Sequence, residues 1–425
     1  MAKALACTMY ARKEYPSLNA SKVKTYVLAL SALFIAAAIV AFPKVSVDAS
    51  LKGLTLWWNV VFPSLLPFFI VAELLIGFGI VTFIGVLFEP IMRPIFKVPG
   101  VGGFVFVMGL VSGFPAGAKF SARLYEEKKL TKTEAERLAS FTNFSNPLFL
   151  FGVVAYEFFH HPALGIVFAL AHYLGNICVG LIMRFYKPHE ADESNGKDTK
   201  RLFYGKVIID ALRKMHEERL KNRKPVGKML GDAVQSSVST LLMVGGFIIL
   251  FSVLNQLLAS LNGTEIIGFL IQYIFAFVHF TPELSQAIVP GLFEITVGAD
   301  KISSVSAPLI EQVILTSFIL GFSGLSIQAQ VTSILSESNL SAKPFFIGRF
   351  FHGTFAAIFA YFLFQLVDID TIGSRNAIPV FGFFEHHQTL MSFVPYLQAG
   401  SIITLTTLII YILSKAVVIS KQNPR

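Results

Sequence analysis

Small and polar residues interrupt strongly apolar sequence at several places, and a solute could bind to a membrane-embedded chain at such places. Each place offers hydroxyl, amide, amino or carboxyl groups, or glycine and proline residues that break a helix. The candidate binding residues are Ser112, Gly113, Pro115, Gly117 and Lys119 in "LVSGFPAGAKF", Asn143 and Asn146 in "FTNFSNPLF", Glu294 and Thr296 in "PGLFEITVG", and Ser323, Gly324, Ser326 and Gln328 in "GFSGLSIQAQ". These groups are suited to hydrogen-bonding a small polar molecule.

The same residue types do not form a recognisable catalytic or metal-binding pattern. The sequence has no HExxH spacing, no nucleotide-binding loop and no paired aspartate cluster. Cys7 and Cys178 are too far apart to suggest a zinc site or a disulfide framework. We therefore expect a protein that is not an enzyme and that has no catalytic residue, cofactor or metal.

The helix breakers have a physical meaning if they lie at membrane depth. Lipid cannot hydrogen-bond the backbone groups that a break releases, so irregular backbone must face protein or a watery cavity. Gly113 and Pro115 prevent a continuous helix, and Ser323 and Gly324 are expected to do the same later in the chain. We expect two opposed re-entrant hairpins whose tips meet near the centre of the bilayer, since helix N-termini exposed there would bind a substrate.

Three candidates near the breaks carry specific expectations. Asn143 and Asn146 are three residues apart and share a helix face, and Pro147 favours an unwound start after Asn146. Ser145 and Gln330 are further polar neighbours. A carboxylate within an apolar run is costly, which makes Glu294 a functional candidate. The structural alternative is that Glu294 pairs with a cation, either Lys119 or Arg349.

Composition supplies the setting for these residues. Of the 425 residues, 54% are hydrophobic and only 14% are charged, whereas about a quarter of a soluble protein is charged. The apolar runs are continuous rather than alternating, a pattern that argues against a transmembrane β-barrel and predicts an all-α, polytopic membrane protein. The net charge of +9 lies mostly in loops. That pattern sets topology in the lipid bilayer and does not predict nucleic-acid binding.

Hydropathy predicts the elements that position the candidates. Spanning helices are expected at residues 26–42, 54–79, 138–158, 164–185, 234–258, 345–364 and 397–418. The first is read as an uncleaved helix with its N-terminus inside rather than as a signal peptide. Shorter apolar pieces, typical of re-entrant or broken helices, are expected at residues 81–96, 101–111, 266–280, 284–297 and 308–321.

A hydrophilic stretch divides the chain into two related halves. Residues 110–131 are similar in pattern to residues 320–341, and each stretch precedes a long Phe-rich helix. The positive-inside rule gives the halves opposite topology, which predicts inverted repeats, although Lys421 and Arg425 leave the side of the C-terminus open. The predicted parts are a tail and first helix (1–50), a first repeat (51–186), a cytoplasmic linker (187–228) and a second repeat with a C-terminal helix (229–425).

Within the linker, residues 202–220 carry apolar side chains at helical spacing. This pattern fits an amphipathic helix on the membrane surface and equally a solvated linker helix.

The windows around residues 109–152, 290–302 and 321–335 together resemble the YlbJ family of sporulation integral membrane proteins, from about residue 51 onward. Each half also resembles the Gate, or nucleoside-recognition, domain shared with concentrative nucleoside transporters. The resemblance implies a multi-pass protein of the cell membrane, in the mother-cell (outer forespore) membrane. It implies transport of dipicolinate out of the mother cell toward the forespore. A nucleoside-like solute and a non-transporting role in spore-envelope (cortex) assembly are the alternatives, and the oligomeric state stays open.

For a dianion such as dipicolinate, the residues lead to further expectations. Helix N-termini, amide donors and Lys119 would attract carboxylates, and Asn143 and Asn146 would bind a carboxylate or the ring nitrogen. Glu294 would repel two carboxylates, so it is expected to be neutralised, paired or set back, and to tune transport rather than to contact the anion.

Overall fold

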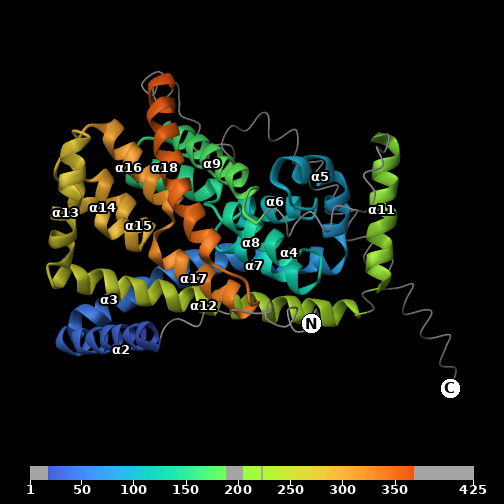
Figure 1. Ribbon diagram of the computed structural model, residues 1–425, viewed down its shortest axis with the longest axis horizontal. Helices are drawn as coiled ribbons and strands as arrows, with labels where there is room; N and C mark the ends of the chain where they lie inside the picture. The colour runs from blue at the N-terminus through green and yellow to red at the C-terminus, as the bar shows by residue number, and fades with distance from the viewer. Residues whose placement is uncertain (1–17, 188–203, 222–223, 368–425) are drawn as a thin grey trace, which may run out of the picture.

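The computed structural model describes residues 18–187, 204–221 and 224–367, and within these ranges it consists of helices and connecting loops without a strand (Figure 1). The all-α prediction is confirmed. The helix expected at residues 397–418 and most of the charged linker lie outside the described residues. Within the described ranges, five helices are long and apolar enough to cross a membrane. The chain is therefore a polytopic helical membrane protein.

The described chain begins with helices α2 and α3 and continues through a series of bent or interrupted helices (Figure 1). The elements are α2 (Leu18–Ala41), α3 (Pro43–Leu56), η1 (Trp57–Val61), α4 (Phe62–Gly77), α5 (Ile80–Phe96), α6 (Gly102–Ser112), α7 (Ala116–Glu126), α8 (Lys132–Phe141), η2 (Phe149–Phe158) and α9 (Leu164–Met183). The chain bends by 84° between α4 and α5, at a break that contains the left-handed Gly79.

The second half follows a helix from the linker and repeats much of this order. The linker helix is α11 (Tyr204–Lys221). The elements of the second half are α12 (Val226–Ser260), α13 (Gly263–Phe277), α14 (Leu284–Phe293), α15 (Ile295–Ser303), α16 (Leu309–Phe322), α17 (Gly324–Glu337) and α18 (Lys343–Leu366). In the first half α3, η1 and α4 run on as one long helix over residues 43–77, which corresponds to α12 in the second half. In both halves the long helix is followed by a shorter one, a pair of short helices, an interrupted helix and a final long helix. The inverted orientation of the halves stays a prediction.

The predicted span over residues 138–158 is wrong as a single helix. Helix α8 ends at Phe141, residues 142–146 are not helical, and the chain becomes helical again at Pro147. Proline suits that position because its missing N–H would be unpaired in the first turn. Sequence hydropathy did not reveal the interruption, because residues 142–146 lie between the apolar Leu138 and Phe141 at the end of α8 and the apolar η2.

The expected hairpin tip at Ser323 and Gly324 is also corrected by the structure. Residues Leu309–Glu337 run as one 29-residue apolar span across this break. The second hairpin lies earlier, where α14 and α15 fold back on each other. A Cβ atom added at Gly298 would lie 2.1 Å from the Cα of Gly291. The reversal occurs at Glu294, whose extended backbone (φ −144°, ψ 120°) turns the chain more sharply than the left-handed Ser323 does.

Helices α9 and α18 pack together in the middle of the protein and bring the two halves into contact (Figure 1). Helix α7 of the first half packs on α17, and α15 of the second half packs on η2. Close approach of α9 and α18 depends on a small residue: a Cβ atom added at Gly175 on α9 would lie 3.0 Å from the backbone nitrogen of Ala356 on α18. The α6–α7 pair of the first half therefore meets the interrupted helix α16–α17 of the second half. In the same way the α14–α15 pair of the second half meets the interrupted helix α8–η2 of the first.

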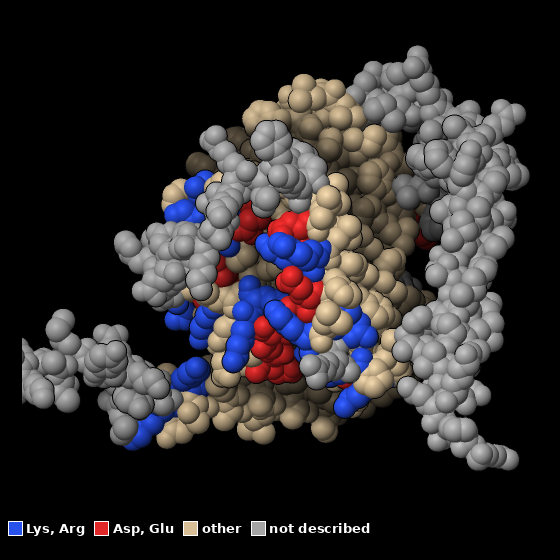
Figure 2. All heavy atoms as spheres, turned by 90° about the vertical axis from the view of Figure 1, so that its right-hand side faces the viewer, with Lys and Arg blue, Asp and Glu red and all other residues tan. Residues whose placement is uncertain are grey.

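Charged side chains gather at one end of the molecule, the end at which α11 lies (Figure 2). Helix α11 packs on α5, and Lys129 forms an ion pair of 3.3 Å with Glu218. The opposite end carries α13, whose large apolar side chains are mostly exposed. Linker helix α11 thus lies against the first half of the protein.

Candidate functional site

A cavity of about 420 Å³ lies where the two hairpins and the two interrupted helices converge. Residues on its wall come from both halves of the chain. Its polar lining residues are Ser112, Ser145, Asn146, Glu294, Thr296, Ser326 and Gln330, beside Gly113 and a mainly apolar remainder that includes Phe114, Phe149 and Phe158. A volume of this size falls within the range of about 300–1,000 Å³ for small-molecule sites.

The tip of the first hairpin, between α6 and α7, forms one wall. Gly113 has φ 76° and ψ −157°, a conformation that side chains disfavour, and the Phe114–Pro115 peptide is cis. The backbone reverses here, and the N–H of Ala116 donates to the Gly113 carbonyl at 2.9 Å. Two predicted residues, Ser112 and Gly113, therefore line the cavity, whereas Pro115 and Gly117 support the turn behind it.

Gly109 and Gly117, from the two helices of this hairpin, enclose the backbone carbonyl of Thr142. A Cβ atom added at Gly109 would lie 2.2 Å from the Thr142 carbonyl oxygen, and one added at Gly117 would lie 2.1 Å from it. Both positions need glycine because any side chain would overlap that oxygen. The hairpin is thus fixed to the start of the non-helical segment 142–146.

Asn146 ends that segment and begins η2. Its side-chain oxygen accepts a hydrogen bond of 2.9 Å from the Phe149 N–H, as in an N-cap. The oxygen is thus engaged, and the NH₂ group of Asn146 has no hydrogen-bond partner among the residues described. This donor is available to a ligand in the cavity.

Asn143 does not line the cavity, although it lies in the same non-helical segment. Its side chain is fully buried, and neither polar atom of its amide has a partner within the described part of the chain. Its carbonyl accepts a hydrogen bond of 2.6 Å from Arg349 on α18. The segment thus presents Ser145 and Asn146 to the cavity and Asn143 to the protein interior.

Glu294 forms the tip of the second hairpin and lines the cavity beside Thr296. Its carboxylate caps α15, accepting from the Val297 N–H at 2.9 Å and from the Thr296 hydroxyl at 3.1 Å. No ion pair joins Glu294 to Lys119 or Arg349 in the described chain. The carboxylate is therefore set at a helix N-terminus, where the helix dipole favours a negative charge.

The second break, between α16 and α17, packs directly against this hairpin. A Cβ atom added at Gly324, whose φ is 60°, would lie 3.1 Å from the carbonyl oxygen of Phe293. The side-chain amide of Gln328 donates to the Phe322 carbonyl at 2.9 Å and so satisfies the end of α16. Ser323, Gly324 and Gln328 shape the break but do not line the cavity, whereas Ser326 does.

Lys119 is not brought to the cavity. Its ammonium group lies 3.4 Å from the carboxylate of Glu73 on α4 and above the ring of Phe69. Glu73 also accepts a hydrogen bond of 2.9 Å from Ser236 on α12. The positive charge of Lys119 is thus largely balanced where it lies, and it joins α7 to two other helices.

Two polar residues that the sequence indicated only as neighbours, Ser145 and Gln330, line the cavity. The apolar lining residues Phe114, Phe149 and Phe158 had no distinguishing signal, because the sequence contains 43 phenylalanines. Only the three-dimensional structure shows which of these phenylalanines line the cavity.

A second cavity of about 540 Å³ adjoins the first and shares Phe158 and Thr296 with it. Its other lining residues include the charged side chains of Asp48, Lys52, Asp300 and Lys301, all of which are exposed. The 420 Å³ cavity therefore borders a second, more polar cavity, which is called the vestibule below.

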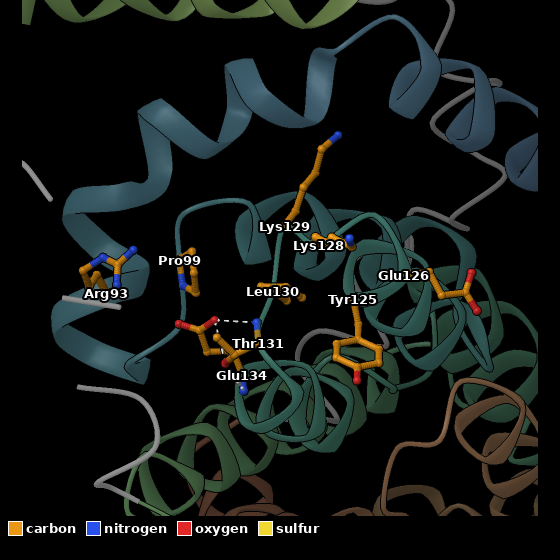
Figure 3. Close-up of a pocket in the computed structure, with 9 residues that line it drawn as sticks. All are labelled: Arg93, Pro99, Tyr125, Glu126, Lys128, Lys129, Leu130, Thr131 and Glu134. Carbon is orange, nitrogen blue, oxygen red and sulfur yellow. Dashed lines mark hydrogen bonds between the residues drawn. The ribbon is translucent and has the colours of Figure 1, made fainter. Parts of the chain in front are cut away.

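A third cavity of about 590 Å³ lies beneath the loop between α7 and α8 (Figure 3). Its wall contains a capping box in which the Thr131 N–H donates to the Glu134 carboxylate at 2.8 Å and the Glu134 N–H donates to the Thr131 hydroxyl at 3.3 Å. This arrangement stabilises the start of α8. The helix breaks do not reach this cavity, and we do not regard it as the substrate site.

Comparison with known proteins finds one matching family model and two related proteins. Residues 58–161 match the Gate family, described as nucleoside recognition, and this range contains the first hairpin and the first break. The chain is 52% identical over 348 residues to the sporulation integral membrane protein YlbJ of Bacillus subtilis (strain 168), covering 82% of this chain and 85% of that protein. It is 32% identical over 167 residues to an uncharacterized protein of Alkalihalophilus pseudofirmus, covering 38% of this chain and 34% of the relative. No solved structure matches.

Proposed function

Because the chain belongs to the family of the sporulation integral membrane protein YlbJ, we propose that it is a membrane transporter for a small organic solute. The observation that carries the proposal is the convergence of two hairpin tips and two interrupted helices on one cavity. Irregular backbone at membrane depth is tolerated where it lines a cavity, and carriers commonly place substrate sites there. We assign no catalytic role to the lining residues.

For the solute we propose dipicolinate. The start of α17, whose Ser326 lines the cavity, has no side-chain cap from its N-cap residue Ser323, and a helix N-terminus favours a carboxylate. The free NH₂ group of Asn146 and the hydroxyls of Ser112 and Ser326 can donate hydrogen bonds, and Phe114, Phe149 and Phe158 can contact an aromatic ring. Glu294 already accepts hydrogen bonds from its own helix, so its role is to tune transport rather than to hold the anion.

A nucleoside-like solute is the second candidate, and two observations favour it. The Gate family that matches residues 58–161 is described by nucleoside recognition. The cavity lining contains the carboxylate of Glu294 and the amide of Gln330 but no Lys or Arg side chain among its described residues. A neutral solute with several hydroxyl groups would not be repelled by Glu294.

The proposal also covers the membrane in which the protein lies and the direction in which dipicolinate moves. We propose the mother-cell membrane around the forespore as the location, with the α11 end of the molecule in the cytoplasm. Positive residues mark the cytoplasmic side of membrane proteins, and Lys129, Lys214 and Lys221 are at or near that end. Dipicolinate would then leave the mother cell through the cavity and the vestibule.

Uptake into vesicles that contain the purified protein alone tests the function. Labelled dipicolinate should accumulate in protein-containing vesicles faster than in empty ones, and unlabelled dipicolinate should compete. Competition by uridine instead of dipicolinate would favour the nucleoside-like solute. Failure to transport either compound in correctly inserted protein would favour a non-transporting role in spore-envelope assembly.

A further inference from the structure

Arg349 is fully buried and binds the non-helical segment of the site from behind. It lies on α18 and is 0% exposed. Its guanidinium donates to the carbonyl of Asn143 at 2.6 Å, to the carbonyl of Ser140 and, at 3.2 Å, to the side-chain oxygen of Asn176. The carbonyls at the end of α8 would otherwise lack partners, because a helix leaves its last carbonyl groups unpaired.

A second arm of the same network reaches Ser145, which lines the cavity. Arg349 contacts His352 Nδ1 at 3.0 Å, and His352 Nε2 contacts the His172 carbonyl at 2.7 Å. His172 Nε2 in turn accepts a hydrogen bond of 3.0 Å from the Ser145 N–H. Arg349 therefore holds the segment 142–146 both directly, through Asn143, and through two histidines from α9 and α18.

The charge of Arg349 is not balanced by a carboxylate. In the described parts of the chain, no Asp or Glu forms an ion pair with it, and its partners are carbonyl groups, an amide and an imidazole. Lys119 differs, because Glu73 lies 3.4 Å from it. A buried cation without a counter-ion is costly, and its field is weakly screened by the protein interior.

We propose that Arg349 is the positioning residue of the site and that its unbalanced positive charge selects an anionic solute. The guanidinium fixes the backbone that presents Ser145 and Asn146, and its field lowers the free energy of a carboxylate in the adjoining cavity. The role that the sequence suggested for Lys119 thus falls to Arg349. This inference rests on the proposed function and specifies that the solute is negatively charged.

Binding of two isosteric probes to the purified protein tests the inference. Dipicolinate carries two negative charges, and pyridine-2,6-dicarboxamide has the same shape without charge. Arg349→Gln keeps hydrogen-bond donors but removes the charge, so it should weaken dipicolinate binding about tenfold more than diamide binding. Arg349→Lys keeps the charge but loses the two-pronged geometry, so it should weaken both probes while keeping their affinity ratio.

A matched control is Arg137→Gln. Arg137 is also 0% exposed and also binds backbone carbonyls, those of Tyr186, Lys187 and Lys97, but these are not cavity residues. Its variant should keep the parental affinity ratio. If Arg349→Gln does not fold, Asn176→Asp places a carboxylate beside the guanidinium and should lower the ratio in the same direction.

The outcomes separate the inference from the proposed function. If the parental protein binds neither probe, the anion site itself is refuted, and with it the role of Arg349. If the parental protein prefers dipicolinate and Arg349→Gln or Asn176→Asp keeps that preference, only the role of Arg349 is overturned. An equal loss of both probes in Arg349→Gln would leave Arg349 a structural residue and would contradict the proposed selection by charge.

Discussion

Gly113 lies against Asn146: a Cβ atom added at Gly113 would lie 3.3 Å from the Asn146 backbone nitrogen and 3.4 Å from its side-chain nitrogen. The hairpin tip and the first interrupted helix thus meet at two residues that both line the cavity. A comparable contact joins Gly324 to Phe293 in the second half. At each pair a glycine lets a hairpin and an interrupted helix approach closely. A substitution that adds a side chain there would increase the distance between them.

Gly113→Ala should abolish most transport while leaving the protein inserted in the membrane. The added methyl group meets Asn146, and the backbone conformation at φ 76° is strained by about 1–3 kcal/mol for a residue other than glycine. Vesicle uptake and thermal unfolding in detergent measure the two effects. Gly246→Ala is the control, because nothing lies within 4 Å of a Cβ atom at that helical position. Parental transport by Gly113→Ala would show that the tip is not part of the site.

Asn146→Asp should eliminate dipicolinate binding with little change in thermal stability. The aspartate keeps an oxygen to cap η2 at the Phe149 N–H, but it replaces the NH₂ donor with a negative group that repels the solute. Asn146→Ala should lose both the cap, worth about 1 kcal/mol, and the donor. Isothermal calorimetry and melting temperatures distinguish the variants. Equal dipicolinate affinity in the parental protein and Asn146→Asp would contradict the assignment of this donor.

Glu294→Gln should change the pH dependence of dipicolinate transport more than the affinity. The amide oxygen still accepts from the Val297 N–H, so α15 stays capped, but the side chain can no longer gain or lose a proton. When the pH is lowered over a range in which the protein stays folded, parental transport should rise, because protonation of Glu294 removes a like charge, and the variant should respond less. Initial uptake rates across this range provide the measurement. An identical pH profile in both proteins would count against any role of Glu294 in tuning.

Glu73→Gln should destabilise the protein by about 3 kcal/mol, because it leaves the buried ammonium group of Lys119 without its counter-ion. The double variant Glu73→Gln with Lys119→Met should recover most of this loss and should keep the parental preference for dipicolinate over the diamide. Denaturation in detergent and probe binding measure these effects. A double variant that is stable but no longer prefers dipicolinate over the diamide would show that Lys119, rather than Arg349, selects the anion by charge.

The proposed topology predicts opposite labelling at the two ends of the molecule. In a background without Cys7 and Cys178, a cysteine at Lys221 on α11 should react with an impermeant thiol reagent only in inside-out vesicles. A cysteine at His279, in the loop between α13 and α14, should react in intact cells. Both positions are exposed, so access through the membrane decides the result. The reverse pattern would invert the assignment of the cytoplasmic side.

The sequence predicted the helical membrane class and several cavity residues because those depend on local patterns. A carboxylate within an apolar run identified Glu294, and Asn146 before proline identified the unwound start. Ser112, Gly113, Thr296 and Ser326, which the sequence also indicated, line the same cavity.

Longer-range pairing could not be predicted from these patterns. The sequence could not show that Lys119 meets Glu73, or that Arg349 meets Asn143, since each pair joins distant segments. It also misplaced the second hairpin at Ser323. Glycine and serine mark a break in a helix, but whether the chain then reverses depends on the backbone angles of the next residues and on packing, as the turn at Glu294 illustrates.

The Thr142 carbonyl enclosed by Gly109 and Gly117 has a mechanical consequence. The first hairpin cannot slide along the neighbouring segment, because the oxygen would collide with one of the two helices. A displacement imposed on Phe114 by a solute would therefore be transmitted to Thr142 and, through Asn143 and Arg349, to α18. The first hairpin, the segment 142–146 and α18 should therefore move together as one rigid unit. The hinges of a transport motion would then lie outside this unit.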